Sequence, residues 1–418
     1  MKCIDDIVRI LSIKELSDGI KCLCEIGVKS CLEEKMKDFS FKIPQEIVFG
    51  MGTLKKLPQI LRDNGSERVL VISDPGLEKV GAVKHVTDVL DDENIQHTSY
   101  LGIKPNPTTD MVYEALKIYQ DFEATSILAI GGGGPMDVAK SVGVLAKYGG
   151  KITDYEGAHL VPGPIVPLIA IPTTAGTGSE VTAFSVIVDK SRDYKFTVFS
   201  YELLPKYALL DPEMIMSVPR SVAAACGVDA FIHASEAYVS TLASPFSDTM
   251  AEKAMELIGA NIRRFVENRR DADAACAMLA GSMFAGIAFA WARLGNIHAM
   301  SHPVSAYFGV AHGVANAILM PYIFDFNKYA AADGRYEKIY NYISEEKEPV
   351  KNFKPEMLVE ELKNLNKALG IPERLSDAGV TDEHFESMTA DAMKSGNVEA
   401  NPRQTTAKDI MDLYIKAL

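Results

Sequence analysis

Residues 126–140 read SILAIGGGGPMDVAK, and this stretch decides the predicted fold. The apolar residues 126–130 are typical of a buried strand, and the four glycines at 131–134 let the backbone turn tightly or approach a ligand closely. Pro135 suits the first position of a helix, whose free N–H groups can bind a pyrophosphate. The stretch predicts a strand, a turn and a helix. Phosphate binding stays one of two interpretations, because the glycines lack the spacing of the ordinary dinucleotide fingerprint.

A second stretch of this kind, PTTAGTGSE at residues 172–180, follows another apolar run and strengthens the phosphate-binding interpretation. It lacks the lysine of a P-loop, so ATP hydrolysis is not indicated. Threonine hydroxyls and exposed amides at the end of a strand suit a ribose-phosphate ligand. Asp74 ends the apolar run at 68–74, where its carboxylate could bind an adenosine ribose and repel a 2′-phosphate, which favours NAD(H) over NADP(H). The alternative is that Asp74 is a solvated turn residue.

Between residues 41 and 216 the chain alternates apolar runs with helical patterns, which is typical of parallel βαβ units. Residues 182–189 and 194–200 flank a polar turn and predict a hairpin. After Arg220 the pattern becomes helical almost to the C-terminus. We therefore predict a Rossmann-like α/β dinucleotide-binding domain and an all-α metal-binding domain. The predicted units are an N-terminal extension (1–40), an α/β NAD-binding domain (41–216) and an α-helical metal and catalytic domain (217–418).

Composition excludes several classes of protein. The net charge of −13 gives no basic surface for nucleic acid or anionic lipid. We expect no membrane span, because no apolar run approaches the roughly 18 residues required. Six cysteines in 418 residues do not indicate a disulfide scaffold, so a reducing cytoplasm is expected.

The N-terminal extension differs from the rest of the chain. Its apolar residues recur at helical spacing, and it holds four of the six cysteines: Cys3, Cys22, Cys24 and Cys31. One interpretation is a short helical appendage. The other is an amphipathic docking peptide, within residues 1–38, that recruits the protein to a partner or a protein shell.

Four of the eight histidines lie between residues 233 and 312. Asp229 and His233 are four residues apart in a helical context, as are His298 and His302, and that spacing places each pair on one helix face. His312 follows. One aspartate with three histidines makes a divalent-cation site that suits Fe²⁺ and is also acceptable to Zn²⁺.

These motifs resemble those of the iron-containing (group III) alcohol dehydrogenases, in the same order. The matching stretches are 131–140, 172–180, 227–236 and 294–313, and the resemblance runs from about Phe41 to the C-terminus, including Asn401-Pro402-Arg403. The resemblance implies a homodimer or larger assembly and NAD(H) with Fe²⁺ as cofactors. It implies metal ligands Asp229, His233, His298 and His312, with His302 near the nicotinamide, and dinucleotide contacts from Gly132, Gly133, Gly134, Asp137, Thr173, Thr174, Thr177, Lys195 and Asp74.

By the same resemblance, the metal would activate a small primary alcohol, hydride would pass to NAD, and His302 would relay the hydroxyl proton. Phe184 and Phe289 are expected to line an apolar pocket for a short carbon chain. Trp291, a third expected pocket residue, and Arg293 lie on what should be the wall of this pocket. Small or amide residues are common there in the family, so these two leave the substrate open.

Three alternatives remain. The nearest is a zinc-dependent glycerol or polyol dehydrogenase of similar architecture. A metal-free carbonyl reductase is opposed by the complete ligand set, and so is a non-catalytic NAD-binding structural protein. Short extensions of related enzymes direct cargo into bacterial microcompartments, so we expect a cytoplasmic enzyme with a microcompartment as one destination.

Overall fold

The computed structural model describes residues 41–42, 46–192, 194–332, 334–346 and 350–418. The proposed docking helix and the four cysteines of the extension lie outside the described residues.

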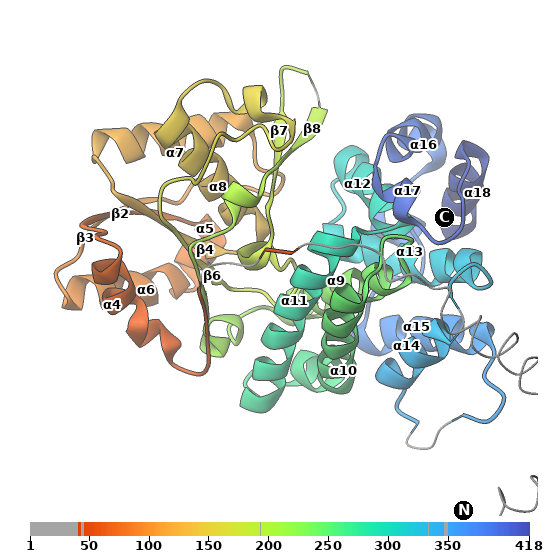
Figure 1. Cartoon of the computed structure of the whole chain (residues 1–418). Helices are drawn as coiled ribbons and strands as arrows, with labels where there is room; N and C mark the ends of the chain where they lie inside the picture. The colour runs from red at the N-terminus through yellow and green to blue at the C-terminus, as the bar shows by residue number, and fades with distance from the viewer. Residues whose placement is uncertain (1–40, 43–45, 193, 333, 347–349) are drawn as a thin grey trace, which may run out of the picture. The chain divides into compact units, whose positions relative to one another are not determined.

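Six parallel strands form the main sheet, in the order β1-β9-β6-β4-β2-β3 (Figure 1). The predicted strands at 68–74, 126–130 and 167–172 are present with slightly different ends, whereas β1, β3 and β9 were not anticipated. In β3 the sequence QHTSY is too polar to stand out as a strand. The strands are β1 (Glu46–Phe49), β2 (Arg68–Ile72), β3 (Gln96–Tyr100), β4 (Ser126–Gly131), β6 (Leu168–Pro172) and β9 (Tyr207–Leu210).

Helices cover both faces of this sheet, so its central strands are buried on both sides. In β2, Leu70 and Ile72 belong to one apolar cluster, while Val69 and Val71 belong to another on the opposite face. The α/β part of the predicted fold is therefore confirmed. The helices of this domain are α4 (Leu57–Asp63), α5 (Pro75–Lys79), α6 (Ala82–Asp92), α7 (Thr109–Asp121) and α8 (Gly133–Tyr148).

The predicted hairpin is also present. It consists of β7 (Phe184–Asp189) and β8 (Tyr194–Phe199), which pair antiparallel, and β5 (Gly157–Ala158) adds a third strand. The short helix η4 (Ser179–Val181) precedes the hairpin, and η5 (Tyr201–Leu203) follows it.

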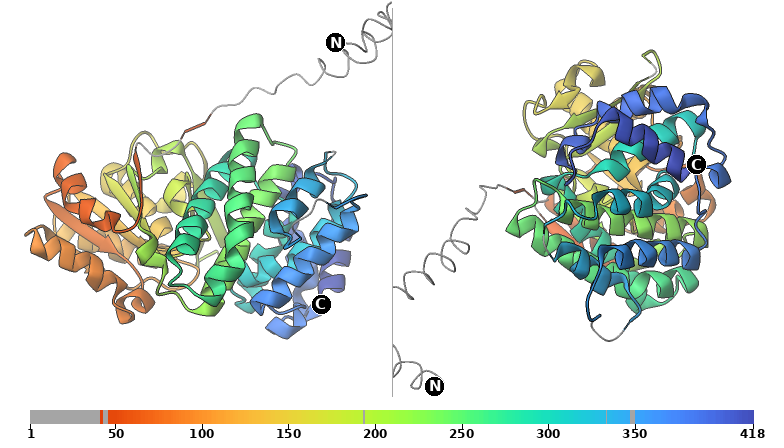
Figure 2. Two further views of the ribbon diagram at one scale, coloured as in Figure 1. Left: turned by 90° about the horizontal axis from the view of Figure 1, so that it is seen from below. Right: turned by 90° about the vertical axis from the view of Figure 1, so that its right-hand side faces the viewer.

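From residue 220 onward the described residues form helices, as predicted, and Figure 2 shows them in green to blue, packed on one another. The helices are α9 (Arg220–Val239), α10 (Pro245–Glu267), α11 (Ala272–Ala292), α12 (Asn296–Phe308), α13 (His312–Asn327), α14 (Arg335–Ile343), α15 (Pro355–Leu369), α16 (Phe385–Met393), α17 (Asn397–Ala400) and α18 (Ala407–Ala417).

One expectation about apolar runs was wrong. Helix α11 is long and apolar enough to cross a membrane by length and composition alone. It packs against α9 and α10, and 61% of its apolar window is buried. Those contacts are typical of a core helix, and they explain its composition without a membrane.

Candidate active site

The two predicted phosphate-binding stretches lie side by side at the carboxyl ends of neighbouring strands. Gly131 at the end of β4 pairs with Pro172 at the end of β6. A Cβ atom added to Gly132 would lie 3.2 Å from Oγ1 of Thr174, so the glycine is what allows this close approach. Helix α8 starts at Gly133, two residues before the predicted proline. Backbone N–H groups and threonine hydroxyls therefore face the same space, as a pyrophosphate site requires.

The threonines differ in their surroundings. Thr173 is buried, and its N–H donates to the carbonyl of Gly131, which joins the two strand ends. The Thr174 hydroxyl is buried and, apart from the nearby Cys226 thiol, has no hydrogen-bond partner in the described part of the chain. Thr177 accepts a hydrogen bond from the N–H of Ser179. The unsatisfied hydroxyl of Thr174 is a group that a polar ligand would complete.

Lys140 holds the two stretches together and was not singled out in the sequence. Its side chain is fully buried in α8, and its Nζ donates to the carbonyls of Ser179 and Phe184, both at 2.8 Å. Burial lowers the pKa of Lys140 to about 8. The ammonium thus fixes the segment between β6 and β7 against the helix that begins the glycine turn.

Asp137 and Lys195, two further predicted dinucleotide contacts, lie close to each other. Asp137 accepts a hydrogen bond from the Ser179 hydroxyl, and desolvation raises its pKa to about 6. The charge of Lys195 acts on Asp137 and also on His302 and His312. Lys195 is therefore near both Asp137 and the histidines His302 and His312.

Asp74 caps helix α5, because its Oδ1 accepts hydrogen bonds from the N–H groups of Gly76 and Leu77. It follows β2, and the chain order in the sheet reverses between β2 and β4. Dinucleotides bind at such a reversal in open α/β sheets. The capping role gives Asp74 a structural function, and a ribose contact stays a prediction.

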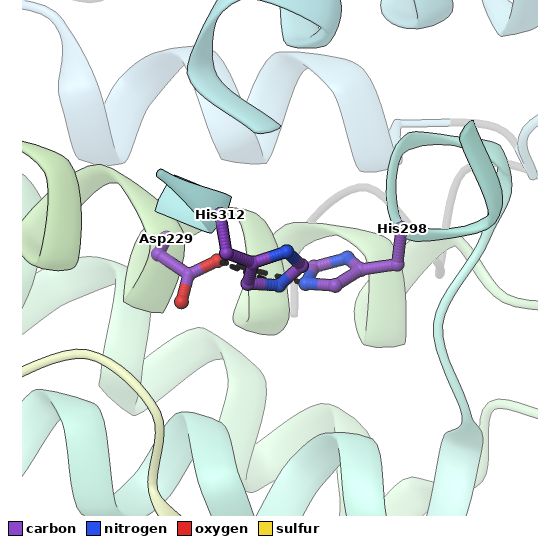
Figure 3. Close-up of side chains that lie close together, drawn as sticks. All are labelled: Asp229, His298 and His312. Atoms are coloured by element: carbon purple, nitrogen blue, oxygen red, sulfur yellow. Dashed lines mark ion pairs between the residues drawn. The ribbon is translucent and has the colours of Figure 1, made fainter. Parts of the chain in front are cut away.

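The four predicted metal ligands converge on one carboxylate oxygen. Oδ1 of Asp229 lies 3.9 Å from Nε2 of His233, 3.6 Å from Nε2 of His298 and 3.9 Å from Nε2 of His312. Figure 3 shows Asp229, His298 and His312 pointing toward one another from separate helices. Their ligand atoms all lie within 4.8 Å of one another. One oxygen and three imidazole nitrogens suit Fe²⁺ or Zn²⁺.

Two of the histidines are oriented by groups behind them. Nδ1 of His298 lies 2.6 Å from Oε2 of Glu236, and Nδ1 of His233 lies 3.1 Å from the carbonyl of Gly176. A proton on each Nδ1 leaves the Nε2 lone pair free for a metal. Glu236 was not predicted as a site residue, although Asp229, His233 and Glu236 share one face of α9 by their spacing of four and three.

The electrostatics of the cluster favour a cation. Although burial opposes it, the nearby histidines hold the pKa of Asp229 well below its usual range. Burial lowers the pKa of His233 to about 4 and that of His312 to about 3. Against the effect of burial, hydrogen bonds with Asp229 and Glu236 raise the pKa of His298 to about 9. Asp229 is therefore held in its ionised form, and His233 and His312 in their neutral forms, which are the forms of these side chains that bind a cation.

Asn316 supports the same interpretation and was missed in the sequence. Its Nδ2 lies 2.6 Å from Oδ1 of Asp229, 3.0 Å from Nε2 of His298 and 3.1 Å from Nε2 of His312. Its Oδ1 is buried without a hydrogen-bond partner among the described residues. The amide nitrogen thus contacts three of the four predicted ligand atoms, and the unsatisfied Oδ1 is a buried polar atom that a ligand or water would complete.

His302 lies beside the ligands on α12. Its ring centroid is 5.2 Å from that of His312 and 6.3 Å from that of His298. Burial, with the charges of His312 and Lys195, holds the pKa of His302 well below its ordinary value. The neutral form of this imidazole is therefore favoured at physiological pH.

Aromatic side chains continue outward from the metal ligands. Phe289 stacks on His233 with centroids 4.5 Å apart, and Phe184 lies 6.5 Å from Phe289. Trp291 stacks on Tyr201 at 5.0 Å, so the α/β and helical domains meet through both ring pairs. The three predicted substrate-pocket residues thus belong to one aromatic region, whereas Arg293 contacts Gly396 instead.

Comparisons with known proteins agree with this geometry. The family model described as iron-containing alcohol dehydrogenase matches residues 44–212, and the C-terminal model of the Fe-containing alcohol dehydrogenase family matches residues 223–418. The chain is 35% identical to alcohol dehydrogenase 4 of Schizosaccharomyces pombe, covering 93% of this chain and 92% of that protein. It is 33% identical to the NAD-dependent methanol dehydrogenase of Bacillus methanolicus, covering 91% and 100%. A crystal structure of 1,3-propanediol oxidoreductase superposes with a TM-score of 0.88 at 32% identity, covering 91% and 100%.

Proposed function

The chain belongs to the iron-containing alcohol dehydrogenase family, and from this premise we propose that it interconverts a small primary alcohol and its aldehyde at the Asp229 centre. As a member of that family it is an NAD-dependent oxidoreductase. The observation that carries the proposal is the meeting of Asp229 with three imidazole nitrogens beside two converging phosphate-binding stretches.

A bound Fe²⁺ or Zn²⁺ would supply Lewis acidity toward the substrate oxygen, and NAD(H) would supply the hydride chemistry. Asp229, His233, His298 and His312 would hold the cation. The protein contributes orientation: Glu236 and the carbonyl of Gly176 fix the two buried imidazoles, and Lys140 fixes the cofactor segment.

His302 is proposed as the proton carrier. Its half-buried ring has its centroid 5.2 Å from that of the predicted ligand His312, and its neutral form is favoured. In alcohol oxidation it would accept the hydroxyl proton and pass it toward solvent, and in aldehyde reduction it would return one.

A small apolar substrate is favoured by Phe184 and Phe289. The ring of Phe289 stacks on the predicted ligand His233, the ring of Phe184 lies near that of Phe289, and neither ring offers a hydrogen-bonding group to a polyol. Iron is favoured by the family, and zinc fits the same donors. A zinc-dependent polyol dehydrogenase stays the second candidate, on the evidence of the donor set alone, and a structural NAD-binding protein is disfavoured by the intact ligands.

We further propose a cytoplasmic homodimer or larger assembly, with residues 1–38 recruiting it to a bacterial microcompartment shell or core protein. The basis is the helical apolar spacing in that sequence. Deleting residues 1–38 should spare alcohol dehydrogenase activity and abolish co-purification with shell proteins. Co-purification of the truncated protein would contradict the docking role.

The first test is anaerobic oxidation of NADH with propanal, comparing metal-free, Fe²⁺-loaded and Zn²⁺-loaded protein. Activity that requires added metal supports the proposal and identifies the active metal. His298→Ala should lose metal and activity together, whereas His302→Ala should retain the metal and turn over slowly. Metal retention by the first variant would refute the ligand assignment, and unchanged turnover by the second would remove His302 from the proton path. If propanal fails under every loading, a panel of hydroxyaldehydes and polyols tests the second candidate.

A further inference from the structure

The start of helix α12 is capped by side chains from distant parts of the chain. Its N-cap residue is Gly295, which has no side chain to accept the free N–H groups of the first turn. Instead, the N–H of Ile297 donates to Oε1 of Glu236 at 2.8 Å, and the N–H of Asn296 donates to Oδ1 of Asn401 at 3.3 Å. The predicted ligand His298 is the next residue.

This arrangement requires glycine at position 295, because the two acceptor side chains approach its backbone closely. A Cβ atom at this position would lie 2.9 Å from Oε1 of Glu236 and 3.1 Å from Oδ1 of Asn401. Both acceptors therefore reach the backbone only because this residue is glycine. Glu236 also binds the imidazole of His298, so one carboxylate fixes the helix start and the ligand ring together.

Asn401 is itself held by several buried hydrogen bonds. It exchanges two side-chain hydrogen bonds of 2.9 Å with Asn327, and its Nδ2 also donates to the carbonyl of Arg403. Thr405 accepts a 2.8 Å hydrogen bond from the amide of Asn296. Asn296, Asn327, Asn401 and Thr405 are all buried. Among the described residues, Oδ1 of Asn296 has no hydrogen-bond partner, but the side-chain polar atoms of Asn327, Asn401 and Thr405 are paired. A buried network with so many of its groups paired has little freedom to rearrange.

The network connects the helices of two ligands. Asn327 is the last residue of α13, and His312 is the first. Asn401 therefore contacts the start of the helix that carries His298 and the end of the helix that carries His312. We infer that Asn401 is a positioning residue of the metal centre, which sets the relative placement of α12 and α13 from outside the ligand sphere. This inference rests on the proposed metal site.

The test measures metal affinity of the full-length protein. Metal-free wild type and Asn401→Ala are titrated with Zn²⁺ and Fe²⁺ in competition with a chelator. Outer partners of metal ligands typically change affinity by about 10- to 100-fold. We expect the Asn401→Ala dissociation constant to rise at least about tenfold, with a changed visible spectrum in the Co²⁺-substituted protein.

Asn366→Ala is the matched control. Asn366 is also a buried asparagine, and it donates to the carbonyl of Ala317 in the same helix α13, but it does not cap α12. It should lower stability while leaving the dissociation constant within about threefold of wild type. Equal metal affinity in Asn401→Ala and wild type, or equal losses in both variants, would overturn the inference.

A second variant covers failure to fold. If Asn401→Ala gives no native circular dichroism, Thr405→Val removes the acceptor of the Asn296 amide with little change of shape. Its metal affinity should fall about three- to tenfold, and a wild-type value would overturn the inference. Wild type that binds no metal at all would refute the proposed function, which is a separate outcome.

Discussion

Replacing Lys140 by methionine tests how helix α8 holds the segment between β6 and β7, which carries the predicted dinucleotide threonines. Methionine keeps an unbranched chain of similar length and removes the ammonium. Two carbonyl oxygens, those of Ser179 and Phe184, then lose a donor at 2.8 Å inside the protein. The hydroxyl of Ser179 loses a third contact, at 3.0 Å.

The expected magnitude follows from two opposing effects. Each buried acceptor left without its donor costs about 1–3 kcal/mol. Removing the ammonium also removes its desolvation cost, which is large enough to lower the pKa of Lys140 to about 8. We expect the first effect to dominate, because Asp137 and Glu180 also lose their compensating charge. The net loss in the free energy of unfolding should be roughly 2–3 kcal/mol.

Urea unfolding at pH 7 measures this change, with Lys147→Met as the control. Lys147 lies on the same helix and donates to the carbonyl of Pro164 at the surface. Its replacement should change the free energy of unfolding by less than about 0.5 kcal/mol. The Lys140 variant should also bind NADH more weakly, because the segment that carries Thr174 and Thr177 loses its anchor. If both variants have the same stability within 0.5 kcal/mol, Lys140 is not an anchor.

Three further predictions follow from individual contacts. The pKa of Lys140 is about 8 in the folded protein and 10.5 ordinarily, so between these pH values the unfolded chain binds one more proton than the folded protein. The free energy of unfolding of wild type, measured in urea relative to that of Lys140→Met, should therefore rise with pH between about 8 and 10.5. Trp291→Ala removes the ring stacked on Tyr201 and should raise kcat/KM for hexanal relative to propanal about tenfold; an unchanged ratio would place Trp291 outside the substrate path. Asp74→Asn keeps a residue type that caps helices but removes the negative charge, so the ratio of kcat/KM with NADPH to kcat/KM with NADH should rise roughly five- to tenfold. A constant ratio would leave Asp74 with only its capping hydrogen bond from Gly76.

The parts of the site that the sequence could predict are those carried by local spacing. Residues four apart on a helix face the same way, so the pairing of Asp229 with His233 was accessible from the pattern alone. The same rule extends to Glu236, three residues further, and could have identified it. The strands β4 and β6 were recognisable because they are buried on both faces, whereas the edge strands β1 and β3 carry mixed or polar residues.

The parts that could not be predicted depend on contacts between distant segments. Asn401 lies 105 residues from Asn296, and no periodicity relates the two. The contact between His233 and Gly176 is of the same kind, since it joins a helix of the second domain to the threonine stretch of the first. One segment therefore carries the predicted dinucleotide threonines and also contacts the predicted metal ligand His233 through its backbone carbonyl. If both predicted sites are correct, a shift of this segment on dinucleotide binding would be expected to move His233, because the two share this contact.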